Sequence, residues 1–221
     1  MPVGPGWLGL GRRVVAMLGL LPARLPNRSP DERGGVFPAQ GARKGRVALL
    51  QGCAQAVLAP SINEAATRLL TRKGIEVVRA AGEGCCGALV HHMGRETQAL
   101  VQARANIDAW TREIGNGGLD AILITASGCG TTIKDYGFML RHDPAYAARA
   151  ARVSALARDI SEYLVTLDLG APVQASLPAV AYQSACSLQH GQKITRQPKG
   201  LLESCGFEVR EPGEALSLIH I

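Results

Sequence analysis

Two adjacent cysteines, Cys85 and Cys86, lie between glycines in the stretch Gly84 to Gly87, with Cys53 upstream and Cys129 downstream. A cysteine can be a small buried hydrophobe, but that role requires no flanking glycine. Glycine lets a backbone come close to a bulky ligand. Thiolates bind zinc and iron–sulfur centres. The pattern therefore favours a metal or cluster site, with a strained disulfide between the two neighbours as the alternative.

The composition is typical of a globular protein with reduced cysteines. The 221 residues suffice for one sizeable domain or two small ones. The six cysteines are widely spaced, unlike the dense disulfide frameworks of small secreted domains. The apolar run Val14 to Ala23 is too short to span a bilayer and has no small-residue cleavage site after it. These features predict a cytoplasmic chain.

The net charge of +6 comes from one end of the chain. Residues 1–46 hold eight lysine and arginine residues against two acidic ones. A basic segment of this kind is compatible with a membrane surface, an acidic partner or nucleic acid. No nucleic-acid motif accompanies it, so we expect no nucleic-acid partner. Residues 1–45 are rich in Gly, Pro and Arg, and are interpreted as a solvated connector.

Short apolar runs predict buried strands at 47–50, 75–78 and 121–124. Ser61 and Glu64 have the form of a capping box, which predicts a helix start there. A second helix is expected from about 94 to 114, and a helical region after Gly130 to about 167, broken near Pro144. The residues expected to face inward on the first two helices are Ile62, Ala65, Ala66, Leu69, Leu70, Leu100, Ala103, Ile107 and Trp110.

Alternation of strands and helices with short glycine-containing turns predicts an α/β fold with a mostly parallel sheet. Cys53, the Cys85–Cys86 pair and Cys129 each follow the carboxyl end of a predicted strand. Ligands of open α/β sheets bind at that edge. The sequence therefore predicts that four thiolates meet there.

An internal repeat begins near residue 176. Val180 to Cys186 echoes Val47 to Cys53, and Gly206 to Val209 echoes Gly74 to Val77. A second cysteine pair is then expected near 216–217, but the chain reads Ala-Leu-Ser-Leu-Ile-His-Ile from 215 to 221. We expect a connector at 1–45, a first half-domain at 46–175, a truncated second half-domain at 176–215 and a non-native tail at 216–221. Cys186 would then lack its partners, and Cys205 would be a structural or free thiol.

Long stretches of the chain resemble the Cys-Cys-Gly domain found in heterodisulfide reductase and related electron-transfer subunits. The iron–sulfur subunit of bacterial glycolate oxidase (glycolate dehydrogenase) is the better match. The resemblance covers roughly residues 38–214. The matching stretches are Arg46 to Gln55, Ile62 to Ala65, Gly84 to Leu89, His91 to Arg95, Thr125 to Thr132 and Tyr182 to Gly191.

The resemblance implies an electron-relay subunit beside flavin-containing subunits that oxidise glycolate to glyoxylate. It also implies a membrane-linked electron acceptor, with peripheral attachment at the inner face of the bacterial membrane as one option. Full-length relatives carry a ferredoxin-like domain with the C-x2-C-x2-C-x3-C-P pattern, which this sequence lacks. The isolated fragment is therefore expected to be inactive. The sequence contains neither a P-loop nor a Ser/His/Asp order that would indicate a different chemistry.

The family implies that Cys53, Cys85, Cys86 and Cys129 are cluster ligands. The heterodisulfide reductase branch ends its motif with C-x2-C, whereas Thr132 stands at the last position here. Four thiolates still suffice for a [4Fe–4S] cluster or an all-cysteine zinc site. His91 and His92 are further candidate ligands, with a polar or proton-relay role as the alternative. A zinc-binding or free-thiol scaffold subunit and a thiol–disulfide protein using Cys85–Cys86 are the competing functions.

Overall fold

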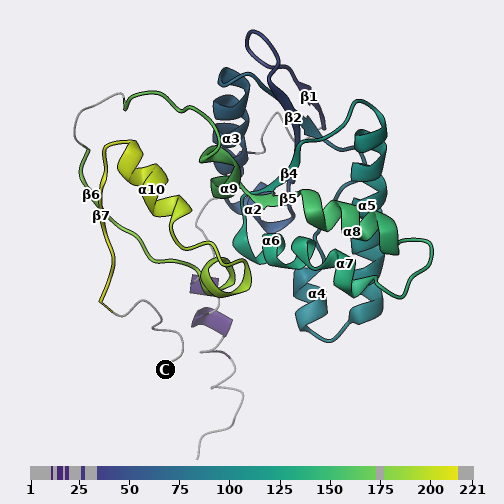
Figure 1. The fold of residues 1–221 in the computed structure, drawn as a ribbon. Coiled ribbons are helices and arrows are strands. Elements are labelled where there is room, and N and C mark those ends of the chain that lie inside the picture. Colours follow the sequence, from purple (N-terminus) through teal and green to yellow (C-terminus); the bar gives the residue numbers. More distant parts are fainter. Residues whose placement is uncertain are drawn as a thin grey trace, which may run out of the picture.

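The computed structural model describes residues 34–172 and 177–213, together with 11, 14–16, 18–19 and 26–27. Within these residues, five strands form one sheet in the order β1-β3-β2-β4-β5 (Figure 1). The strands are β1 (Gly35–Phe37), β2 (Gly45–Leu49), β3 (Ile75–Arg79), β4 (Ala121–Ile124) and β5 (Ala157–Asp159). All neighbouring pairs are parallel except β1 with β3. The predicted α/β fold with a mostly parallel sheet is confirmed.

The strands β1 and β5 lie where no strand was predicted. β1 falls within the segment interpreted as a connector, and β5 within the region predicted to be helical. Each has three residues, which is too short for an alternating pattern to stand out. Both lie at edges of the sheet, where pairing with a neighbouring strand, rather than local sequence, determines the conformation.

The central strands place alternate side chains on opposite faces of the sheet, as strand geometry requires. On one face Ala48, Ile122 and Ile124 pack with helices α5 (Glu96–Gly115), α7 (Tyr136–Met139) and α8 (Ala147–Leu156). On the other face Leu49 and Leu123 pack with helices α3 (Pro60–Arg72) and α9 (Ile160–Leu164). Figure 1 shows these two helical layers on either side of the sheet. A sheet covered on both faces explains the continuous apolar runs of its strands.

The helices are α2 (Ala54–Leu58), α3 (Pro60–Arg72), α4 (Ala88–His92), α5 (Glu96–Gly115), α6 (Ser127–Lys134), α7 (Tyr136–Met139), α8 (Ala147–Leu156), α9 (Ile160–Leu164) and α10 (Gln197–Ser204). A π-helical turn covers Ser187–Gly191. Among the residues that the structure describes, no helix is both long enough and apolar enough to cross a membrane. The apolar run Val14 to Ala23 lies partly outside the described residues.

Helix α3 differs from its prediction in both its start and its buried face. It begins at Pro60, and Ser61 lies inside its first turn without making a cap, so the predicted capping box is wrong. Ile62 and Ala65, both predicted to face inward, are exposed, whereas Asn63 is buried. Asn63 donates to the carbonyls of Leu50 and Gln51, which lie just after β2. The polar anchor therefore sets the rotation of the helix.

Helix α5 agrees closely with its prediction. Ala103, Ile107 and Trp110 are fully buried, and Leu100 packs against the same cluster while partly exposed. The prediction missed Asn106, which is also fully buried on this helix. A buried amide is costly unless its polar atoms are hydrogen-bonded, so its partners are informative.

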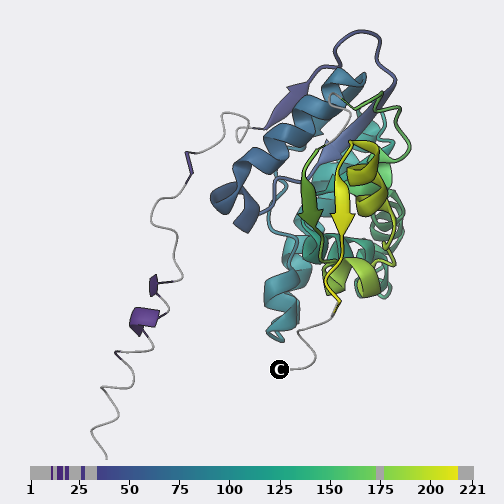
Figure 2. The same cartoon turned by 90° about the vertical axis from the view of Figure 1, so that its left-hand side faces the viewer.

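A second, smaller sheet follows the first. The strands β6 (Ala179–Ala181) and β7 (Glu208–Arg210) run parallel, with the π-helical turn and α10 between them in sequence. Figure 2 shows the two strands side by side with α10 beside them. Val180 pairs with Val209 in this sheet, and the positions that they echo, Val47 and Val77, pair in the first. The predicted tail, 216–221, lies outside the described residues.

Candidate metal or cluster site

The four candidate cysteines lie at the carboxyl ends of three adjacent strands. Cys53 follows β2 and precedes α2, Cys85 and Cys86 lie between β3 and α4, and Cys129 lies in the first turn of α6. Figure 1 shows α4 and α6 at the same end of the sheet. The chain leaves β2 to form β3 on one side and later β4 on the other. This topological switch point is where open α/β sheets bind ligands.

The thiols form two pairs that each join different loops. The Sγ atoms of Cys53 and Cys85 are 3.5 Å apart, and those of Cys86 and Cys129 are 3.0 Å apart. Cys53 is exposed and Cys86 is buried, whereas Cys85 and Cys129 are intermediate. The adjacent cysteines therefore reach toward two different loops. The site extends from the surface into the protein.

Hydrogen bonding and burial shift the pKa values of Cys53, Cys86 and Cys129 in different directions. The pKa of Cys86 is raised well above its usual range, because its thiol donates to Cys129 and is buried. The pKa of Cys129 is lowered because its sulfur accepts that bond. Burial, followed by the hydrogen bond to Cys85, raises the pKa of Cys53. Repulsion between neighbouring thiolates also raises the pKa of Cys53 and Cys86, and a bound cation would offset that repulsion.

The donor set fits a thiolate-bound centre in kind and number. Four cysteines satisfy both a [4Fe–4S] cluster and a structural zinc ion. A cavity of about 60 Å³ lies between the loops after β2 and β4, and Cys53 and Cys129 both line it. In the described part of the chain, no three His, Cys, Asp or Glu side chains already surround one ion position. The thiols are thus gathered as two pairs rather than as a finished coordination sphere.

A partly buried carboxylate that the sequence analysis missed connects two of the cysteine loops. Glu83 accepts hydrogen bonds from the backbone N–H of Gln51 and from Nε1 of Trp110, each at 3.0 Å. Burial raises the pKa of Glu83 to about 7. Gln51 lies two residues before Cys53, and Glu83 two residues before Cys85. The carboxylate therefore fixes both loops to α5.

The other candidate ligands lie farther along the same elements. His91 and His92 are exposed at the end of α4. Among the described residues they join no group of three metal-binding side chains. Cys186 precedes the π-helical turn, whose Ser187 bonds to Ser127 at the start of α6, with 2.8 Å between the two Oγ atoms. The segment that follows Cys186 thus contacts the helix that carries Cys129.

Thr132 occupies the position at which the related branch has its last cysteine. It is buried, and its hydroxyl donates to the carbonyl of Gly128 on the same helix at 3.3 Å. This internal bond gives the hydroxyl a structural partner one turn earlier. Thr132 therefore has a hydrogen-bonding role within α6.

Only one of the two glycines that flank the cysteine pair has a conformation that requires glycine. Gly87 has φ of +86°, and a Cβ there would lie 3.1 Å from the carbonyl oxygen of Ala99 on α5. Gly84 has open space around its Cβ position. The close approach at Gly87 brings α4 against α5, which is a packing role rather than the ligand contact that the motif suggested.

We expect Gly87→Ala to lower the free energy of unfolding by about 2 kcal/mol, because it combines left-handed backbone strain with a tight contact. The matched control, Gly84→Ala, is expected to change it by less than about 0.5 kcal/mol. Urea unfolding of the metal-free proteins, followed by circular dichroism, measures both changes. Equal stabilities of the two variants would contradict this account of Gly87.

Comparisons with known proteins agree with the geometry. Residues 47–134 match the cysteine-rich domain family abbreviated CCG, and this range contains all four site cysteines. Among related proteins, the glycolate oxidase iron-sulfur subunit of Escherichia coli is 39% identical over 205 residues, covering 90% of this chain and 50% of that protein.

Two further relatives extend the comparison. The probable glycolate oxidase iron-sulfur subunit of Bacillus subtilis is 31% identical over 93% of this chain and 46% of its own length. Lactate utilization protein A of Halalkalibacterium halodurans is 25% identical over 75% of this chain and 66% of its own. The chain spans about half the length of the two glycolate oxidase subunits. Residues 47–134 thus match the cysteine-rich CCG domain family, within a chain that is similar to part of the iron–sulfur subunits of glycolate oxidase.

Proposed function

We propose that this chain is an electron-transfer subunit of an oxidoreductase and that Cys53, Cys85, Cys86 and Cys129 hold its iron–sulfur cluster. The observation that carries the proposal is the convergence of these four thiols, from three loops, at the switch point of the sheet. Similarity to glycolate oxidase iron–sulfur subunits supports it. The substrate of the whole complex is then glycolate, which a flavin-containing partner oxidises to glyoxylate.

The chain contributes positioning and electrostatics in this proposal. A [4Fe–4S] cluster, when bound, would accept and release single electrons. Cys53 lies at the exposed end of the site and Cys86 at its buried end, so the protein limits solvent access from one side. A flavin partner would deliver electrons at the exposed end, and a membrane-linked acceptor would receive them. We place the chain in the cytoplasm, with attachment to the inner face of the membrane through its partners.

The second small sheet suggests how the domain is repeated. We propose that residues 46–175 form one half-domain and that residues 176–215 begin another. The matching register of β2 with β3 and of β6 with β7 supports this division. Cys186 would correspond to Cys53 in a second site. Because the ferredoxin cysteine pattern is not among these 221 residues, we propose that the chain alone supports no glycolate-dependent dye reduction when mixed with the flavin subunit.

A zinc-binding scaffold is the second candidate function, and one distance favours it. Four sulfurs around zinc, with Zn–S bonds near 2.3 Å, are separated by about 3.8 Å in a regular tetrahedron. The 3.5 Å between the Sγ atoms of Cys53 and Cys85 is near that value, whereas the 3.0 Å between those of Cys86 and Cys129 is shorter. In this alternative the metal would join the three loops for partner binding, without redox chemistry.

Metal and sulfide analysis of anaerobically purified protein distinguishes the two functions. We expect iron with acid-labile sulfide in the parent protein, and a loss of most of both in Cys85→Ser, because one of four thiolates is removed. The matched control is Cys205→Ser, whose thiol is exposed at the end of α10 and which should retain the full content. Stoichiometric zinc without sulfide would favour the scaffold. A folded parent without any metal would overturn both proposals.

A further inference from the structure

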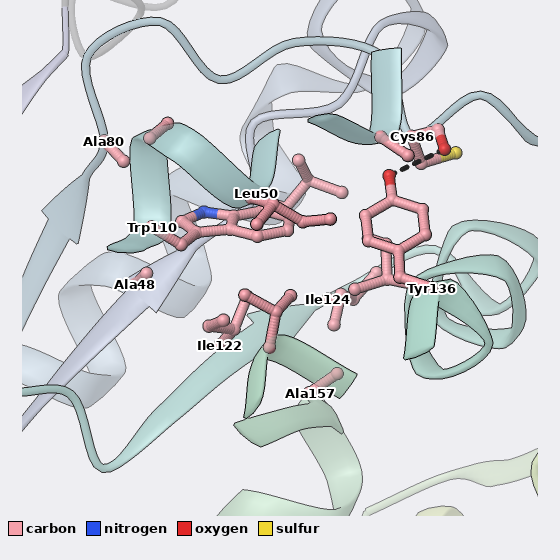
Figure 3. Close-up of a cluster of buried hydrophobic side chains, with 14 of the residues drawn as sticks. Ala48, Leu50, Ala80, Cys86, Trp110, Ile122, Ile124, Tyr136 and Ala157 are labelled. Carbon is pink, nitrogen blue, oxygen red and sulfur yellow. Dashed lines mark hydrogen bonds between the residues drawn. The ribbon is translucent and has the colours of Figure 1, made fainter. Parts of the chain in front are cut away.

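Two buried side chains from other elements form hydrogen bonds with backbone groups of the loop that carries the cysteine pair. The backbone N–H of Gly84 donates to Oδ1 of Asn106 at 2.8 Å, and Nδ2 of Asn106 donates to the carbonyl of Cys85 at 3.0 Å. The hydroxyl of Tyr136 donates to the carbonyl of Cys86 at 2.7 Å. Figure 3 shows this last bond, with the tyrosine ring packed beside Ile124 in the core.

The two side chains also bond to each other and so act as one unit. Nδ2 of Asn106 donates to the hydroxyl oxygen of Tyr136 at 3.2 Å. Both residues are fully buried, Asn106 on α5 and Tyr136 at the start of α7. Three of the four hydrogen bonds form a chain from the N–H of Gly84 to the carbonyl of Cys86, and the fourth branches from Asn106 to the carbonyl of Cys85. The orientation of the amide is therefore fixed by its partners.

Such a network is costly to bury and costly to leave incomplete. A buried amide or hydroxyl without partners loses several hydrogen bonds to water, so evenly matched donors and acceptors are needed. Here both Nδ2 hydrogens have acceptors, and the tyrosine hydroxyl both accepts and donates. Apolar side chains at these two positions would leave the carbonyls of Cys85 and Cys86 unpaired. The network thus holds one particular conformation of the loop.

We propose that Asn106 and Tyr136 are positioning residues for the four-thiol site. With both cysteine carbonyls bonded on the inner side, the adjacent thiols are directed to different loops, Cys85 to Cys53 and Cys86 to Cys129. The network thereby opposes an arrangement in which the thiols of Cys85 and Cys86 contact only each other. The claim that this arrangement positions the ligands of a bound centre rests on the proposed function. The hydrogen bonds themselves do not depend on it.

The first test is the pairing of the thiols in the metal-free protein. Oxidised glutathione converts two neighbouring thiols into one disulfide while one molecule of it is reduced to two of glutathione. Peptide mapping of the parent is expected to find Cys53–Cys85 and Cys86–Cys129. In Tyr136→Phe the yield of Cys86–Cys129 should fall at least threefold, with Cys85–Cys86 appearing, because the Cys86 carbonyl is released.

The matched control is Tyr146→Phe. This change also removes a phenol hydrogen bond, of 2.9 Å, but the partner of Tyr146 is the side chain of Asp108 rather than a group of the cysteine loop. The variant should give the parent pattern of disulfides. A parent pattern in Tyr136→Phe, or a vicinal Cys85–Cys86 disulfide in the parent, would overturn the proposal.

A second measurement needs no variant and covers the case in which Tyr136→Phe does not fold. Hydrogen exchange in the parent should protect the amide of Gly84 as strongly as those in the middle of α5, because both open with the buried network. Exchange of Gly84 at the rate of exposed loop amides would contradict a fixed loop.

Reconstitution with ferrous iron and sulfide connects the network to the proposed centre. Iron content should fall at least twofold in Tyr136→Phe and remain at the parent value in Tyr146→Phe. A parent that takes up no iron refutes the proposed function, while the disulfide pattern and the exchange of Gly84 still decide the role of Asn106 and Tyr136. Equal iron content in both variants would count against that role.

Discussion

Replacing Trp110 by alanine is expected to lower the free energy of unfolding by about 4 kcal/mol, because a large buried side chain is removed and a cavity is left. Its indole is fully buried in the cluster between the sheet and α5, near Ala48 and Leu50 (Figure 3). The change also removes the Nε1 donor from the partly buried carboxylate of Glu83, which keeps its bond from the N–H of Gln51. The lost hydrogen bond adds to the cost.

Urea denaturation of metal-free protein, followed by circular dichroism, measures this loss. Phe138→Ala is the control, because that aromatic side chain is 60% exposed and its removal should cost less than about 1 kcal/mol. Since Glu83 holds the loop of Cys53, Trp110→Ala should also slow metal uptake by the variant. A loss of less than about 2 kcal/mol would mean that the indole is not the main support of this part of the core.

The second large effect is a decrease in stability as the pH rises from about 4.5 to about 7. Burial raises the pKa of Glu83 from 4.5 in the unfolded chain to about 7 in the folded protein. Between these values the folded state binds more protons than the unfolded state, so each increase in pH favours unfolding. The difference corresponds to roughly 3 kcal/mol, which is lost progressively across this window and does not increase above it.

Urea unfolding of the metal-free protein at a series of pH values tests this prediction. Glu83→Gln removes the titrating group, so its stability should vary much less between pH 4.5 and 7. The pKa of Asp143 is lowered by its hydrogen bond to Arg104, and this group acts only at lower pH. A parent whose stability rises through the window, or a Glu83→Gln variant with the parent slope, would contradict the assignment.

The sequence was sufficient for the features that depend on local patterns. The apolar runs of β2, β3 and β4 and the helical spacing of Ala103, Ile107 and Trp110 indicated the central strands and α5. Parallel strands place their carboxyl ends at one edge. The positions of the four cysteines along the chain were therefore enough to assign them to that edge. The same local signals were too weak for the three-residue strands β1 and β5.

The tertiary structure decided which side chains meet. The buried face of α3 follows from Asn63 and the carbonyls after β2, which local helical periodicity does not reveal. The thiol pairing joins residues 32 and 43 positions apart. The network beneath the cysteine loop joins Asn106 and Tyr136 to groups 21 to 50 positions away.

A sequence pattern does not reveal these contacts, and the reason is physical. A buried asparagine, glutamate or tyrosine hydroxyl is tolerated only where distant backbone groups match its donors and acceptors. Their positions are set by the packing of the sheet against α5 and α7. The sequence by itself determined the fold class and the edge of the sheet that holds the cysteines, whereas only the packed chain determined how those cysteines are paired and supported.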